Sequence, residues 1–95
     1  MAAYIYILHS NKLSRFYVGT TELPVVERLK LHLTQTYGNS KYTAKADDWQ
    51  IFTWFECQDI SQARRIERFI KKQKSKSYIE QLSDDFRQQW LLENI

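Results

Sequence analysis

Two short apolar runs near the start of the chain limit its fold more than any other feature. They are Tyr4-Ile5-Tyr6-Ile7-Leu8 and Phe16-Tyr17-Val18-Gly19, and the residues between them are mostly polar. Runs rich in β-branched and aromatic residues on both sides of a short polar segment are typical of a β-hairpin. A turn centred on Asn11-Lys12 predicts the cross-strand pairs Tyr6 with Tyr17, Tyr4 with Gly19 and Leu8 with Arg15.

Alternation of side chains along each strand gives this hairpin one apolar face and one phenolic face. The apolar face is expected to point into the core and comprises Ile5, Ile7, Phe16 and Val18. The other face has Tyr6 and Tyr17, with Gly19 leaving open backbone beside them. Two phenols in this position fit either a functional site or an ordinary aromatic cross-strand pair. The hairpin alone favours the ordinary pair.

The length and composition of the chain indicate one folded domain over residues 1–95, since 43% of the residues are hydrophobic and the chain has two glycines and one proline. The single cysteine, Cys57, excludes an internal disulfide, and with His9 and His32 as the two histidines there is no zinc-type ligand cluster. The sequence has no apolar run of membrane-spanning length and no signal-peptide pattern. We therefore expect a cytoplasmic protein without a membrane partner.

Positive charge is concentrated in one segment, although the net charge is only +3. Residues 64–76 contain a single acid, Glu67, and seven basic residues: Arg64, Arg65, Arg68, Lys71, Lys72, Lys74 and Lys76. Residues 77–95 are predominantly acidic. The basic segment suggests a polyanionic partner such as DNA or RNA, and a solvated helix face is the alternative.

The middle of the chain predicts a helix and a loop. Helical spacing runs from Pro24 to about Thr36, with Gly38 as the terminating residue. The apolar stripe of this helix comprises Val25 or Val26, Leu29 and Leu33, and its flank contains Arg28 and His32, which an exposed helix surface would explain. The polar residues 38–48 predict a surface loop that includes Lys41, Tyr42 and Lys45.

The second half of the chain predicts a third strand and two helical segments. The strand, 49–57, is expected to be covered on both sides, with Ile51, Phe55 and Cys57 on one face and Phe52 and Trp54 on the other. Asp59 and Gln62 form a capping box that begins a helix reaching about Gln73, and Ala63, Ile66 and Ile70 face inward. Glu67 lies at the margin of that stripe, where ion pairs with Arg64 and Lys71 are the default explanation and a functional carboxylate is the other.

A final helical segment, 77–94, is expected to pack back and complete the core. The predicted fold is α+β, with a three-stranded antiparallel sheet flanked by helices in the order β-β-α-β-α-α.

Five short motifs occur in one order along residues 3–82. They are Tyr4-Ile5-Tyr6, Tyr17-Val18-Gly19, Arg28 with His32, Lys41-Tyr42-Thr43 and Glu67-Arg68-Phe69-Ile70-Lys71. In this order the chain resembles the GIY-YIG endonuclease superfamily, and more closely its small stand-alone members related to the N-terminal nuclease domain of the bacterial excinuclease ABC. The ordered set is far more specific than any one motif.

The resemblance implies a metal-dependent DNA endonuclease that hydrolyses phosphodiester bonds and leaves a 3′-hydroxyl and a 5′-phosphate. It implies one divalent ion, Mg²⁺ or Mn²⁺, held by Glu67. The implied catalytic residues are Tyr6, Tyr17, Arg28, His32 and Glu67. An arginine and a metal ion would stabilise charge on the phosphate and the leaving oxygen. The general base is either Tyr6 or Tyr17, and Tyr6 is preferred.

Phosphate contacts without sequence preference are expected from Lys41, Tyr42, Lys45, Arg64, Arg68, Lys71, Lys72 and Lys74. Specificity would then come from DNA shape or from a partner protein, in DNA repair or the processing of unusual DNA structures. A non-catalytic nucleic-acid-binding module on the same fold is the alternative, and a protein-interaction surface of exposed aromatic residues is a third. The chain departs from the family pattern at Tyr4, a glycine in relatives, at Thr20, a lysine in the repair nucleases, and in having no matching asparagine after Glu67.

Overall fold

The computed structural model describes residues 2–33 and 46–95. Its antiparallel sheet has the strand order β2-β1-β3 and consists of β1 (Ala3–Ser10), β2 (Arg15–Thr21) and β3 (Gln50–Cys57). The helices are α1 (Val25–Leu33), α2 (Ile60–Lys72), α3 (Lys76–Glu80), the 3-10 helix η2 (Gln81–Ser83) and α4 (Asp85–Asn94). The predicted α+β fold is confirmed. The expected end of the first helix near Thr36 and Gly38 lies outside the described residues.

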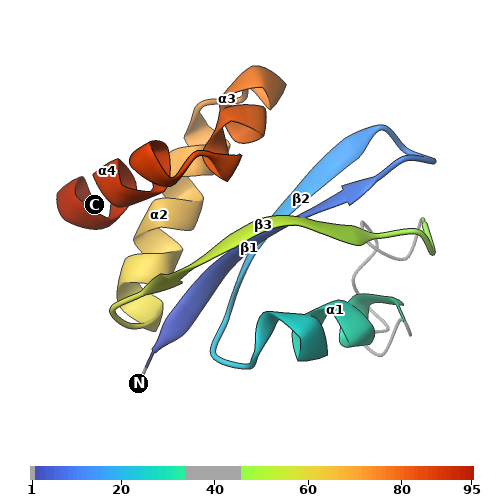
Figure 1. Cartoon of the computed structure of the whole chain (residues 1–95), viewed down its shortest axis with the longest axis horizontal. Coiled ribbons are helices and arrows are strands. Elements are labelled where there is room, and N and C mark those ends of the chain that lie inside the picture. Colours follow the sequence, from blue (N-terminus) through green and yellow to red (C-terminus); the bar gives the residue numbers. More distant parts are fainter. Residues whose placement is uncertain (1, 34–45) are drawn as a thin grey trace.

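The sheet separates two hydrophobic layers, because α1 lies on one side of it and α2, α3 and α4 on the other (Figure 1). The layer under α2 and α4 includes the predicted core residues Ile5, Ile7 and Val18. The layer under α1 comprises Tyr6, Leu8, Val25, Ala46 and Trp49. The central strand β1 is therefore buried on both faces, which explains its nearly continuous apolar sequence.

The hairpin register differs from the predicted one. Tyr6 pairs with Gly19 rather than with Tyr17, because β1 continues to Ser10 and the turn comprises residues 11–14. Ser14 closes this turn with a left-handed backbone, φ 50°. The difference is an even number of residues, so every side chain keeps its predicted face. Tyr6 and Tyr17 are thus diagonal neighbours, with ring centroids 6.2 Å apart.

A β-bulge changes two of the predicted faces of β3. Ile7 and Leu8 are consecutive on β1, whereas their partners Thr53 and Ile51 are separated by Phe52. The extra residue reverses the alternation beyond it. Phe52 consequently packs in the layer under α2 and Ile51 in the layer under α1, each opposite to the prediction.

Hydrogen-bonded caps define the helices after the sheet. Asp59 accepts a hydrogen bond from the backbone of Gln62 over 2.8 Å, which confirms the predicted start of α2. The expected single helix 77–94 is divided instead, because Asp84 has extended backbone and caps a new helix, α4. Leu82 and Leu91 are nevertheless buried in the layer under α2, so this segment completes the core as predicted.

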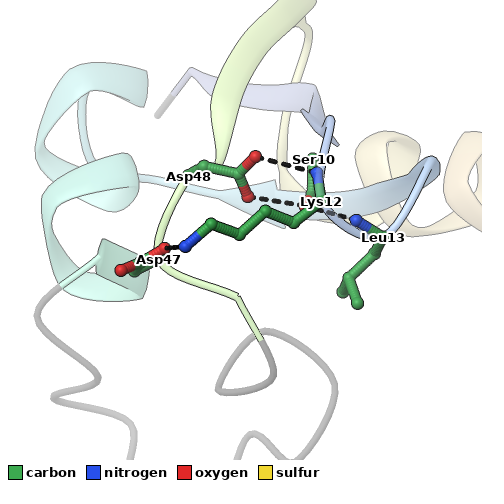
Figure 2. Close-up of polar contacts among 5 residues, drawn as sticks. All are labelled: Ser10, Lys12, Leu13, Asp47 and Asp48. Atoms are coloured by element: carbon green, nitrogen blue, oxygen red, sulfur yellow. Dashed lines mark hydrogen bonds and ion pairs between the residues drawn. The ribbon is translucent and has the colours of Figure 1, made fainter.

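Two aspartates that precede β3 are bonded to the turn between β1 and β2 (Figure 2). Asp48 accepts hydrogen bonds from Ser10 Oγ over 2.6 Å and from the backbone of Lys12 over 3.0 Å, and Asp47 forms an ion pair with Lys12 Nζ. Ser10 is fully buried, so its hydroxyl requires such a partner. This contact keeps Ser10 in the strand and fixes where the chain enters β3.

Candidate active site

Three of the predicted site residues form a hydrogen-bonded group between β1 and α1. Arg28 Nε donates to Tyr6 Oη over 3.2 Å, and Tyr6 Oη lies 2.8 Å from His32 Nε2. Arg28 and His32 lie one helical turn apart, so α1 presents both to the same phenol. Tyr6 is fully buried and His32 is 2% exposed. An exposed helix flank is therefore the wrong interpretation for His32.

The charge state of His32 sets the direction of these hydrogen bonds. Burial, and after it the positive charge of Arg28, lowers the pKa of His32 to about 4. The ring is neutral at pH 7, so Nε2 accepts the Tyr6 hydroxyl proton when the ring proton is on Nδ1. Arg28 donates to the same phenol oxygen. Tyr6 is thus held between a cationic donor and a neutral acceptor.

The stability of the fold is expected to fall between pH 6.5 and pH 4 because of His32. An unfolded histidine binds its proton near pH 6.5, whereas folded His32 binds it only near pH 4. The stability contributed by the neutral ring is complete above pH 6.5 and is lost as the pH falls, by up to about 3 kcal/mol. Urea unfolding at steps from pH 8 to pH 4 measures this loss.

The control is His32→Gln, whose free energy of unfolding should change little over the same range. The pKa values of Asp47 and Asp48 are held below the ordinary value by hydrogen bonds, first from Lys12 and from Ser10 respectively, so these residues titrate at lower pH. Parallel curves for the wild type and the variant would contradict the role of His32.

Tyr17 connects this buried group to the surface. Its ring centroid lies 5.1 Å from that of His32 and 6.4 Å from that of Trp49, both edge to face. The side chain is partly exposed on β2, an edge strand. Tyr17 also lines a groove between β2 and the end of α2. Of the two motif tyrosines, it is the one that meets solvent.

Gly19 is required by the close approach of Tyr6. A Cβ atom at Gly19 would lie 2.5 Å from Tyr6 Oη and 2.6 Å from Tyr6 Cζ. The open backbone expected beside the phenols is thus occupied by the ring of Tyr6. A side chain at this position would displace the phenol from Arg28 and His32.

Glu67 approaches the site from the other side of the sheet, on α2. Its side chain is 22% exposed and its carboxylate lies 2.8 Å from Lys71 Nζ, so the ion pair is with Lys71 rather than with Arg64. Lys71 lines the same groove as Tyr17, which is how the structure connects Glu67 to the phenols. The structure joins the other four predicted site residues to one another directly.

A single carboxylate is the metal ligand that the described residues offer here. Within residues 2–33 and 46–95 there is no group of three or more histidine, cysteine, aspartate or glutamate side chains that could hold an ion. Mg²⁺ keeps several waters and is commonly bound through one or two carboxylates together with substrate phosphates. The partly exposed carboxylate of Glu67, opposed by an exposed lysine that an ion could replace, fits such a site.

The predicted nucleic-acid contacts are described in part. Arg64, Arg68, Lys71, Lys72 and Lys74 are exposed on α2 and just after it. Lys41, Tyr42 and Lys45 lie outside the described residues. The groove beside Tyr17 adds Arg15 and Lys76, which were not among the contacts expected from the sequence. Arg15 precedes Tyr17 by two residues on the same strand, and this spacing places both on one face.

Comparison with protein-family models matches residues 2–80 to the GIY-YIG catalytic domain. The match covers most of the chain and identifies a nuclease-type catalytic domain. The protein belongs to the GIY-YIG family, as the motifs predicted. Comparisons with curated proteins and with solved structures each found no match. No helix in the described parts of the chain is long and apolar enough to cross a membrane.

Proposed function

We propose that the protein is a metal-dependent DNA endonuclease in which Tyr17 takes the proton of the attacking water. The observation that favours Tyr17 over Tyr6 is the difference in burial, since Tyr6 is fully buried and bonded to Arg28 and His32. Tyr17 is partly exposed on an edge strand and lines a groove. A general base must come within hydrogen-bonding distance of its water, which an exposed phenol can do.

The remaining residues would position Tyr17 and stabilise charge. Tyr6 and His32 pack against the ring of Tyr17 and limit its orientation. Arg28 is partly buried beside them, and its guanidinium would stabilise the charge that develops on the phosphate. In water-poor surroundings such a preorganised charge has a larger effect than in bulk solvent.

Glu67 would hold the divalent ion, Mg²⁺ or Mn²⁺. When bound, the ion would neutralise charge on the phosphate and on the leaving oxygen. The ion pair with Lys71 keeps the Glu67 carboxylate at the wall of the groove before an ion binds. The expected products carry a 3′-hydroxyl and a 5′-phosphate.

The wider setting belongs to the same proposal. Specificity would come from DNA shape or from a partner protein, because the exposed cations of α2 recognise phosphates rather than bases. The function would be exercised in the cytoplasm, in DNA repair or in the processing of unusual DNA structures. Family membership supports the nuclease chemistry on which this setting depends.

Replacing Tyr17 with phenylalanine is expected to lower the rate of DNA cleavage by about 10²-fold, because the water loses its proton acceptor. The free energy of unfolding should hardly change. The matched variant is Tyr6→Phe, which removes a buried hydroxyl from Arg28 and His32 and should destabilise the fold by about 1–3 kcal/mol. Single-turnover cleavage of supercoiled, nicked, branched and single-stranded DNA in Mg²⁺ or Mn²⁺ measures the rates.

Two outcomes would contradict the proposal. If Tyr17→Phe cleaves at the wild-type rate while folded Tyr6→Phe is inactive, the base is Tyr6. If the wild type binds DNA in the presence of a chelator but cleaves none of these substrates with either metal, the protein is a non-catalytic binding module.

A further inference from the structure

A groove of about 560 Å³ lies between the edge strand β2 and the end of α2 with α3. Its walls come from residues 14–18 of the hairpin and from Ile70, Lys71, residues 74–76 and Ile79. Lys76 Nζ donates to the carbonyl oxygen of Ser14 over 3.1 Å and so connects the two walls. This volume is typical of a pocket for a small ligand.

Four cations surround the groove, from both of its walls. They are Arg15, Lys71, Lys74 and Lys76, all exposed. Glu67 is bonded to Lys71, so the proposed metal ligand lies beside the same groove. The charge is suited to a phosphate-bearing partner that reaches Glu67 and Tyr17 together.

The lining between these cations is apolar and aromatic. Val18 and Ile70 are buried core residues, and Ile79 and Phe16 are half-buried against them. The ring of Phe16 is held edge to face by Phe52, with centroids 5.0 Å apart. Double-stranded DNA presents phosphates and sugars outward and keeps its bases stacked inside, so it offers nothing to fill an apolar hollow. An unpaired base has two apolar faces that can pack on such a surface.

The backbone of Lys74 supports a functional role for its side chain. Lys74 follows α2 with φ 48°, in the left-handed region. Glycine or asparagine is favoured at this position after a helix, and another residue there is strained. The lysine keeps an ammonium group at the groove at the expense of local stability.

We propose that this groove binds an unpaired nucleotide of the DNA, with its base on the apolar lining and its phosphates on the four surrounding cations. The proposal rests on the endonuclease function proposed above and names its substrate class. The preferred substrate is DNA with a single-stranded segment at the position of cleavage, rather than continuous duplex.

The test measures binding separately from cleavage. Fluorescence anisotropy in EDTA compares a single-stranded 20-nucleotide DNA with the blunt duplex of the same sequence, at several salt concentrations. We expect the single strand to bind about 10-fold more tightly, since each stacked base contributes about 1–3 kcal/mol. Ile79→Ser should weaken single-strand binding about 5-fold and leave duplex binding unchanged, because it removes apolar lining but no charge.

Lys74→Gly separates function from folding. It should raise the urea midpoint of unfolding, because the left-handed position is relieved of strain. It should also weaken single-strand binding about 5-fold and reduce the salt slope by about 0.7. The control is Lys30→Ala on α1, which removes one exposed positive charge on the other side of the sheet.

Duplex binding as tight as single-strand binding, or equal affinities of Lys74→Gly and Lys30→Ala for the single strand, would overturn the proposal. Failure of the endonuclease function looks different. In that case the wild type keeps its preference for single strands in EDTA but cleaves neither substrate when Mg²⁺ or Mn²⁺ is added. Active cleavage of duplex without preference would refute the unpaired-nucleotide site alone.

Discussion

Glu67→Gln is expected to reduce DNA cleavage in Mg²⁺ by about 10²–10³-fold, because the amide cannot supply the negative charge that holds a divalent ion. Glutamine has nearly the same shape, so the helix and its packing are preserved. The carboxylate is 22% exposed and its ion pair is with an exposed lysine, so the free energy of unfolding should change by less than about 1 kcal/mol. Single-turnover cleavage rates and urea unfolding measure the two effects.

A matched control is available on α1. Glu27→Gln removes another glutamate that is paired with a lysine on an exposed helix surface, here Lys30 at 3.8 Å. It should cleave at the wild-type rate. Raising the concentration of Mn²⁺ should partly restore Glu67→Gln if the loss is one of metal affinity. Equal cleavage rates for the two variants would remove Glu67 from the site.

Gly19→Ala is expected to destabilise the fold by about 1–3 kcal/mol and to lower cleavage, through overpacking. The new methyl group would lie 2.5 Å from Tyr6 Oη, and the Tyr6 ring is fully buried beneath α1. The ring must move, and its hydrogen bonds with Arg28 and His32 must lengthen. Urea unfolding gives the stability, and the fraction of active sites in a single turnover gives the effect on function.

A double-mutant cycle identifies the cause. Combining Gly19→Ala with Tyr6→Leu removes the ring that the methyl group strikes, so Gly19→Ala should cost much less in that background. Thr20→Ala, at the next position of β2, is the control for loss of strand propensity. An equal cost of Gly19→Ala with Tyr6 and with Leu at position 6 would show that the ring is not the obstacle.

The faces of the hairpin were predictable although its register was not. Register depends on the length of the turn, which the Ser10 to Asp48 hydrogen bond sets from a distant part of the chain. Faces depend on whether residue numbers are odd or even, and an even shift preserves them. Tyr6 and Tyr17 therefore came together as predicted, while Tyr17 lost its expected partner.

The exchanged faces of Ile51 and Phe52 have a similar origin. Both residues are large and apolar, so either suits either layer, and sequence alternation cannot indicate an inserted residue. The break in the C-terminal segment had a signal in the sequence. Asp84 is a capping residue type within an otherwise helical spacing, and it does begin a new helix.

The sequence by itself determined the element order, the inward stripes and the residue types of the site, because these follow from side-chain periodicity and from local capping. It also determined the family, through motifs whose order survives any error in register. Only the tertiary structure decided that Tyr6 and His32 are buried while Tyr17 is exposed, and that the ion pair of Glu67 lies at the groove that Tyr17 lines. Burial and proximity depend on how the sheet and the helices close around one another, and spacing along one chain does not encode that distance.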